Sequence, residues 1–145
     1  MGCAIARQSL PVPGGFIRES GHFCVHQDPL LPLPGLVVIA SRRHIRSIGE
    51  MTEVEYAEFP GLVRETHAAI KKATQIEYLT LIQEEHSRHF HLWFFPWLLE
   101  IIETYGEPSL AKIRGIMAEV SREPISPEEW RKLEKTIVRI KAYIK

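Results

Sequence analysis

Alternating and continuous apolar runs predict five strands within the first 96 residues. Successive side chains of a strand point to opposite faces, so a period of two favours strands over helices. Glycine, proline or a polar turn separates each run from the next, as in an antiparallel sheet. The third run, LVVIAS, is continuous and predicts a strand buried on both faces. The predicted strands are 15–20, 22–28, 36–41, 77–85 and 89–96.

Helical spacing appears between the third and fourth strands and again after residue 96. Thr52 and Glu55 match a capping box and predict a helix that reaches about Ala73. Ser126 begins a second capping box, and the predicted C-terminal helices are 97–106, 108–123 and 128–144. The fold class is therefore α+β. We expect a core at 1–96 and a helical extension at 97–145 that packs on it, in a single domain.

The last strand places two histidines and a tryptophan on one face. Residues two apart on a strand point the same way, so His89, His91 and Trp93 lie opposite Phe90 and Leu92. Two imidazoles on one face suit metal binding, general acid–base work or nucleophilic attack. The apolar alternation around them favours one of these functions over a pair of surface histidines.

Composition excludes several classes of partner. Lys and Arg number 18 and Asp and Glu also number 18, so no net charge attracts nucleic acid or a membrane surface. No apolar run is long enough to span a bilayer. The 2 cysteines are too few for a disulfide framework, so we expect a cytoplasmic location.

A metal site is the least favoured of the possible roles. Such a site needs three or four ligands. The candidates Cys3, His44, His86 and His89 form no compact pair such as C-x-x-C, and a metal-dependent enzyme would have to use His86, His89 and His91. We therefore expect no bound metal and no other cofactor.

A histidine nucleophile is more consistent with the residues around this strand. An imidazole nitrogen can attack phosphorus, and water can later cleave the phosphoramidate that forms. The attacked phosphate needs hydrogen-bond donors, and Gln83, Ser87 and Arg88 precede the histidine strand.

Residues 89–95, HFHLWFF, resemble the motif His-φ-His-φ-His-φ-φ of the histidine-triad (HIT) superfamily, where φ is apolar. This superfamily contains nucleotide hydrolases and transferases. The segments at 28–35, 36–56 and 80–85 are also similar to family segments, so the resemblance covers about residues 3–96. It implies a HIT-like antiparallel sheet with a central helix.

The resemblance assigns roles to individual residues. His91 matches the nucleophile that forms a nucleotidyl-histidine intermediate, and His89 matches the histidine that orients the site. Asp28 matches the acidic residue that accepts from the ribose hydroxyls. Gln83 and Ser87 match groups that contact the phosphates.

His44 matches a histidine that is structural in most of the family or a zinc ligand in some members. The zinc-binding members carry a C-x-x-C near the start of the chain. Here Ala6 stands three residues after Cys3, so we expect no structural zinc.

Trp93 is the main departure from the family motif, because it replaces the third histidine. An indole N–H donates one hydrogen bond but cannot accept or relay a proton. The hexose-1-phosphate uridylyltransferases have Gln at this position and are active, so the change does not by itself remove catalysis. His86, in the turn before the strand, is a possible substitute donor or acid, and an exposed loop histidine is the alternative interpretation.

The sequence thus predicts a nucleotide hydrolase or nucleotidyl transferase that acts at the α-phosphate. The expected substrate is a purine nucleotide or dinucleotide, of the dinucleoside polyphosphate or nucleoside phosphoramidate class. The base is expected in an apolar slot formed by Ile17, Phe23 and Val25. The alternative is a nucleotide-binding sensor with the same fold and altered chemistry. The resemblance also implies a homodimer, formed through the central helix and the sheet edge.

Overall fold

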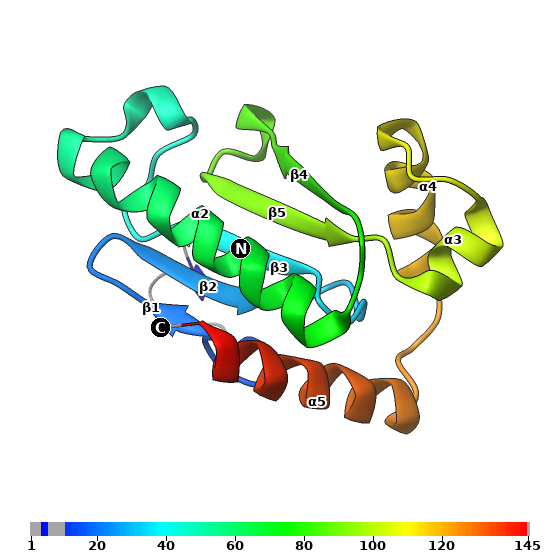
Figure 1. Ribbon diagram of the computed structural model, residues 1–145. Helices are drawn as coiled ribbons and strands as arrows, with labels where there is room; N and C mark the ends of the chain where they lie inside the picture. Colours follow the sequence, from blue (N-terminus) through cyan, green and yellow to red (C-terminus); the bar gives the residue numbers. More distant parts are fainter. Residues whose placement is uncertain (1–3, 6–10, 145) are drawn as a thin grey trace.

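The structure is a computed structural model that describes residues 4–5 and 11–144. Within residues 11–144, five strands and four α-helices follow one another in nearly the order that the sequence predicts (Figure 1). Two short 3-10 helices, η1 and η2, precede α2 and β5. The elements are β1 (Arg18–Glu19), β2 (Phe23–Gln27), β3 (Val37–Ser41), η1 (Ile48–Glu50), α2 (Glu53–Thr74), β4 (Leu79–Gln83), η2 (Glu85–Ser87), β5 (His91–Pro96), α3 (Leu99–Tyr105), α4 (Leu110–Val120) and α5 (Pro127–Tyr143).

The strands form one antiparallel sheet in the order β1-β2-β3-β5-β4. Strand β3 is central, and all five of its residues are buried, as its unbroken apolar sequence predicted. Its neighbour β5 carries His91 and Trp93, and His89 lies two residues before its first residue. Strand β4 is the edge beyond β5. The predicted α+β class is confirmed.

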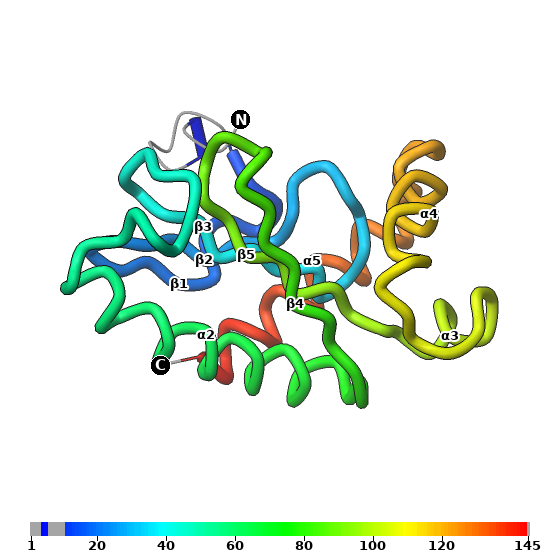
Figure 2. Tube along the Cα trace, turned by 90° about the horizontal axis from the view of Figure 1, so that it is seen from above, coloured from blue at the N-terminus to red at the C-terminus, as the bar shows by residue number. Residues whose placement is uncertain are grey.

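Helices α2 and α5 cover one face of the sheet (Figures 1 and 2). Both helices begin with the predicted capping boxes, at Thr52–Glu55 and Ser126–Glu129. Leu133, Ile137 and Ile140 of α5 lie in the same buried cluster as the core residues of α2 and the sheet. The last helix is therefore part of the main core. The division of the chain at residue 96 stays a prediction.

Helices α3 and α4 pack against one end of the opposite face. Phe95 and Trp97 are buried there among side chains of both helices, including Ile101, Ile113 and Ile116. Trp97 Nε1 donates to Thr80 Oγ1 at 2.9 Å, which ties the end of β5 to β4. No helix within residues 4–5 and 11–144 is long and apolar enough to cross a membrane.

The two faces of β5 divide as the alternation predicted. Phe90, Leu92 and Phe94 belong to the main core beneath α2 and α5. Trp93 lies on the other face, against a small cluster that includes Val38. Among the described residues, α4 covers the far end of that face, and Ile5, Pro29 and Leu30 line a cavity at the histidine end.

Two predictions about the first strands are wrong. Ile17, Phe23 and Val25 were expected to form the base slot, yet all three are buried in the main core on the opposite face. His22 was expected to begin the second strand, 22–28. It instead precedes β2, and its Nδ1 lies 2.7 Å from a carboxylate oxygen of Glu58 on α2. Helix α2 packs on this face of the sheet, which buries Phe23 and Val25 and brings Glu58 close to His22.

Candidate functional site

A cavity of about 200 Å³ lies on the open part of the sheet, over β2, β3 and β5. Three histidines and one carboxylate line it, among apolar side chains. The polar lining residues are His26, Asp28, Ser87, His89 and His91, and the others are Ile5, Pro29, Leu30, Val38, Ala40 and Trp93. The cavity therefore brings together five of the eight predicted site residues, which are Asp28, Ser87, His89, His91 and Trp93.

His91 is held by a backbone carbonyl. Its Nδ1 lies 2.9 Å from the carbonyl oxygen of His89, and a carbonyl can only accept, so Nδ1 carries the proton and donates. In the neutral ring Nε2 then holds the lone pair. The half-buried ring lines the cavity, so the fold prepares Nε2 as a base or nucleophile.

His89 is buried and is fixed in the same way by a distant carbonyl. Its Nε2 donates to the carbonyl oxygen of Ser41 at 2.8 Å, which joins the start of β5 to the end of β3. Burial lowers the pKa of His89, so the ring is neutral. Its other neighbour is the ring of His44, edge-on with centroids 5.5 Å apart. His44 is exposed and is not among the residues that line the cavity.

Asp28 is a buried carboxyl group that also lines the cavity. Its Oδ1 accepts from the backbone N–H groups of Leu30 and Leu31 at 2.8 and 3.0 Å. These bonds shape the loop after β2 and leave acceptor capacity on the second oxygen. Burial raises the pKa of Asp28 against the lowering effect of the two N–H groups.

His26 is a cavity residue that the sequence predictions did not include. It is buried, and its Nδ1 donates to the carbonyl oxygen of Gln27 at 2.8 Å, so Nε2 is its acceptor. Burial lowers its pKa. The sequence pattern places His26 on the same strand face as Cys24. This face can be identified as the cavity side only once β2, β3 and β5 are known to lie side by side.

Ser87 and Trp93 stand on either side of His91. Ser87 Oγ lies 2.8 Å from the carbonyl of Glu84 and 3.0 Å from that of His89, so its hydroxyl proton is engaged within the turn. Ser87 Oγ is also 3.4 Å from Nδ1 of His91. The indole of Trp93 is tilted against the His91 ring with centroids 5.0 Å apart. Trp93 thus occupies the next position on the histidine face and forms one wall of the cavity.

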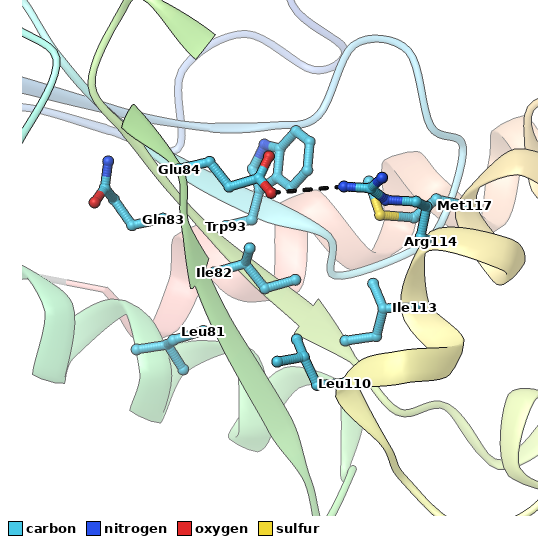
Figure 3. Close-up of a pocket in the computed structure, with 9 residues that line it drawn as sticks. All are labelled: Leu81, Ile82, Gln83, Glu84, Trp93, Leu110, Ile113, Arg114 and Met117. Atoms are coloured by element: carbon cyan, nitrogen blue, oxygen red, sulfur yellow. Dashed lines mark ion pairs between the residues drawn. The ribbon is translucent and has the colours of Figure 1, made fainter. Parts of the chain in front are cut away.

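Gln83 and His86 do not reach this cavity. Gln83 lies opposite Leu92 in the β4–β5 pair, and therefore shares its face, away from the histidines. The side chain of Gln83 donates to the carbonyl of Arg46 at 3.2 Å and points away from Trp93 in Figure 3. His86 is exposed in η2. Neither residue is placed to contact a phosphate at His91 in this structure.

The basic turn after β3 is occupied by structural contacts. Arg43 pairs with Glu55 through two nitrogens, at 2.9 and 2.8 Å. Arg42 donates to the carbonyl of Ser20 and to the carboxylate of Glu19. Both guanidinium groups therefore link the turn to its neighbours and do not line the cavity.

Within residues 4–5 and 11–144, no three His, Cys, Asp or Glu side chains are grouped to hold a metal ion. Cys3, one of the ligands considered from the sequence, lies outside the described residues. His86 is not among the residues that line the cavity with His89 and His91. The described residues therefore give no support to the metal-dependent enzyme.

A second, larger cavity of about 570 Å³ adjoins the first (Figure 3). It is a groove between β4, β5 and α4, and Trp93 lines both cavities. The groove is lined by Leu81, Ile82, Gln83, Glu84, Trp93, Leu110, Ile113, Arg114 and Met117. Sequence patterns did not predict this groove, because four of its lining residues come from α4, which packs beside the sheet only in the folded chain.

No family model matches the sequence, and no curated protein matches it. Solved structures do match. A hypothetical histidine triad nucleotide-binding protein from Sulfolobus tokodaii aligns with a TM-score of 0.67 and 20% identity, over 97% of this chain and 91% of the other. A HIT-like protein involved in cell-cycle regulation from Bartonella henselae, solved with an unknown ligand, gives 0.66 and 18%, over 97% and 93%. A HIT family protein from Bacillus anthracis gives 0.60 and 19%, over 94% and 92%.

These similarities show that the chain has the histidine-triad fold, as the resemblance of residues 89–95 implied. The identities are too low to transfer an activity or a ligand. A match over 97% of the chain also extends past residue 96, into the helical part that the sequence resemblance did not cover.

Proposed function

We propose that the protein is a nucleotide hydrolase or nucleotidyl transferase that acts at the α-phosphate through His91. The observation that carries this proposal is the hydrogen bond from His91 Nδ1 to the carbonyl of His89, at 2.9 Å. It directs the lone pair to Nε2, which is the form that a nucleophilic imidazole needs. The proposed substrate is a nucleoside monophosphate joined to a second group, as in dinucleoside polyphosphates and nucleoside phosphoramidates.

The proposed first step transfers the nucleotidyl group to the protein. The Nε2 lone pair of His91 forms a bond to the α-phosphorus, and the bond from phosphorus to the second group breaks, with its electron pair leaving on that group. Water then attacks the phosphorus, the N–P bond breaks, and the nucleoside monophosphate and a proton are released. An acceptor alcohol in place of water would make the reaction a transfer.

Asp28 and the apolar lining support the nucleotide as the ligand. A carboxylate whose first oxygen is held by Leu30 and Leu31 has a second oxygen that can accept from ribose hydroxyls. Val38 and Ala40 lie on the cavity side of the sheet and give an apolar surface for a base. The base is therefore proposed on this face, in place of the slot that the sequence predicted on the other.

The test is the intact mass of the protein after incubation with diadenosine triphosphate, an adenosine phosphoramidate and an aryl ester of AMP. Wild type is expected to release AMP or to gain the mass of an adenylyl group. His91→Ala is expected to do neither, with a loss of about 10⁴-fold or more in turnover. Wild-type turnover that persists in His91→Ala would contradict the assignment of the nucleophile.

The alternative is a nucleotide-binding sensor, and Trp93 is the observation that favours it. With an indole where the family has a third histidine, the site has one fewer proton carrier. Binding of AMP by calorimetry, without adduct or product from any of the three substrates, would support the sensor over the enzyme.

A homodimer through α2 and the edge strand β4 is also part of the proposal. Val54 and Tyr56 on α2 are exposed, and so is Leu81 on β4. An edge strand has backbone groups that a second copy can pair with. Light scattering on the purified chain tests this, and a monomeric mass at working concentration would contradict it.

A further inference from the structure

The groove beside Trp93 has the composition of a ligand site. Its walls are mostly apolar, with Ile82 on β4 facing Ile113 and Met117 on α4 (Figure 3). Leu110 at the start of α4 is 68% exposed, which is a high value for a leucine beside a cavity. A volume of about 570 Å³ is within the range of small-molecule sites.

Trp93 connects the groove to the histidines. The indole lines both cavities, and its ring centroid lies 5.0 Å from that of His91. A phosphate held at Nε2 of His91 therefore lies next to the indole. Any group attached to that phosphate and directed past Trp93 enters the groove.

The charged residues along the groove indicate which kind of leaving group it can bind. Among the described residues that line it, Arg114 and Glu84 carry charge, and they oppose each other at 3.9 Å. Both side chains are exposed at the rim, so the interior offers apolar contacts. One cation offset by one anion does not match the several negative charges of a polyphosphate.

The described residues that line the groove also include no ready proton donor. The indole of Trp93 donates a hydrogen bond without giving up its proton, and Glu84 faces Arg114 as a carboxylate. No histidine is among the described residues that line the groove. An amine or alkoxide needs a proton to depart, whereas a phenolate or a carboxylate leaves as an anion.

We propose that the groove between Trp93 and α4 binds the leaving group of the substrate, and that this group is an apolar aryl or acyl unit that departs as an anion. The inference rests on the proposed function and narrows its substrate to aryl esters and acyl anhydrides of a nucleoside monophosphate. His91 Nε2 bonds to phosphorus, the P–O bond to the aryl or acyl oxygen breaks, and that oxygen keeps the electron pair. No proton is consumed in this step, and Arg114 stands at the rim where the anion leaves.

The first experiment compares the 4-nitrophenyl ester of AMP with the benzylamide of AMP, in wild type and in Trp93→His. Wild type is expected to hydrolyse the ester and to be nearly inactive on the amide. Trp93→His places a proton carrier at this position, so kcat/KM for the amide is expected to rise about 100-fold, with a much smaller change for the ester. Wild type that cleaves the amide as fast as the ester would overturn the anionic leaving group.

The second experiment tests the groove itself, with adenosine 5′-phosphorofluoridate as a substrate whose fluoride also leaves as an anion but fills no apolar space. Leu110→Glu places a charge at the groove, and the kcat/KM ratio of aryl ester to fluoride is expected to fall about tenfold. Val138→Glu is the matched control, since Val138 is 66% exposed on α5 and outside the groove. An unchanged ratio in Leu110→Glu would overturn the groove as the leaving-group site.

Failure of the proposed function gives a different result. If no substrate is turned over and His91 gains no adduct, the proposed enzymatic activity is excluded. Calorimetry on His91→Ala then tests whether the groove binds the aryl group. The 4-nitrophenyl ester is expected to bind about tenfold more tightly than AMP, with the difference lost in the His91→Ala, Leu110→Glu double variant. Equal affinities for the two ligands would overturn the groove independently of the chemistry.

Discussion

The side chain of His89 donates from Nε2 to the carbonyl oxygen of Ser41 at 2.8 Å, across 48 positions of sequence. The backbone carbonyl of the same residue accepts from His91. His89 therefore joins the end of β3 to the ring proposed as the nucleophile, and we expect it to position that ring.

We expect His89→Ala to lower kcat about 100-fold with little change in KM, because His91 would lose its fixed orientation. His89→Gln should recover much of this loss, since its amide nitrogen can donate to Ser41 as the imidazole does. Steady-state kinetics on both variants provides the measurement. Equal losses in Ala and Gln would point to a role for the imidazole beyond positioning.

Buried neutral histidines give the stability a defined dependence on pH. Burial lowers the pKa of both His26 and His89 below the ordinary 6.5, so the unfolded chain binds more protons there than the folded chain. The free energy of unfolding should therefore fall as the pH drops below 6.5 and should gain nothing more from these groups above it. Denaturant titrations at several pH values measure this slope. The double variant His26→Gln, His89→Gln should reduce it, and an unchanged slope would contradict the assignment.

Glu55 should stabilise the fold down to low pH. Its carboxylate is buried, accepts from Arg43 and closes the capping box of α2, and the bonds from Arg43 lower its pKa to about 2. This contribution is complete above the ordinary value of 4.5 and is lost as the pH falls from there toward about 2. Glu55→Gln should lower the free energy of unfolding by about 1.5–3 kcal/mol at neutral pH.

The exposed Glu53, in the same helical turn, supplies the matched control for Glu55. Glu53→Gln should change the stability by less than about 0.5 kcal/mol. The difference between wild type and Glu55→Gln should shrink as the pH approaches 2. A difference that stays constant between pH 7 and pH 2 would mean that the loss does not come from the charge of Glu55.

Helix α5 should behave as part of the main core. Ile140 is fully buried, so Ile140→Ala should lower the free energy of unfolding by about 2–5 kcal/mol. Val138, on the outer side of the same helix, is 66% exposed, and Val138→Ala should change the stability by less than about 0.5 kcal/mol. Equal effects in chemical denaturation would show that α5 is only loosely attached.

Short-range sequence patterns were sufficient to predict the helices and strands of the fold. The capping boxes at Thr52 and Ser126 predicted two helix starts, and both are confirmed. The alternation in residues 89–96 placed His91 and Trp93 on the face opposite Leu92 and Phe94, which is also confirmed. These signals are local because capping bonds span three residues and a strand repeats every two.

Several functional features depend on contacts that the sequence does not express. The base slot was assigned to the wrong face, because alternation separates two faces of a strand without saying which one a helix covers. Gln83 was assigned to the phosphates by resemblance, and its register opposite Leu92 places it on the face away from the histidines. His26 entered the site only through the pairing of β2 with β3 and of β3 with β5.

The sequence by itself determined the helices, the strands, the histidine face and the resemblance to the histidine-triad fold, because each of these is written in short-range spacing. The tertiary structure decided which groups meet. It brought Asp28 and His26 to His91, fixed the proton on His91 through a carbonyl, and placed α4 beside Trp93 to form the groove. These outcomes depend on strand order and on which helix covers which face, and long-range packing sets both.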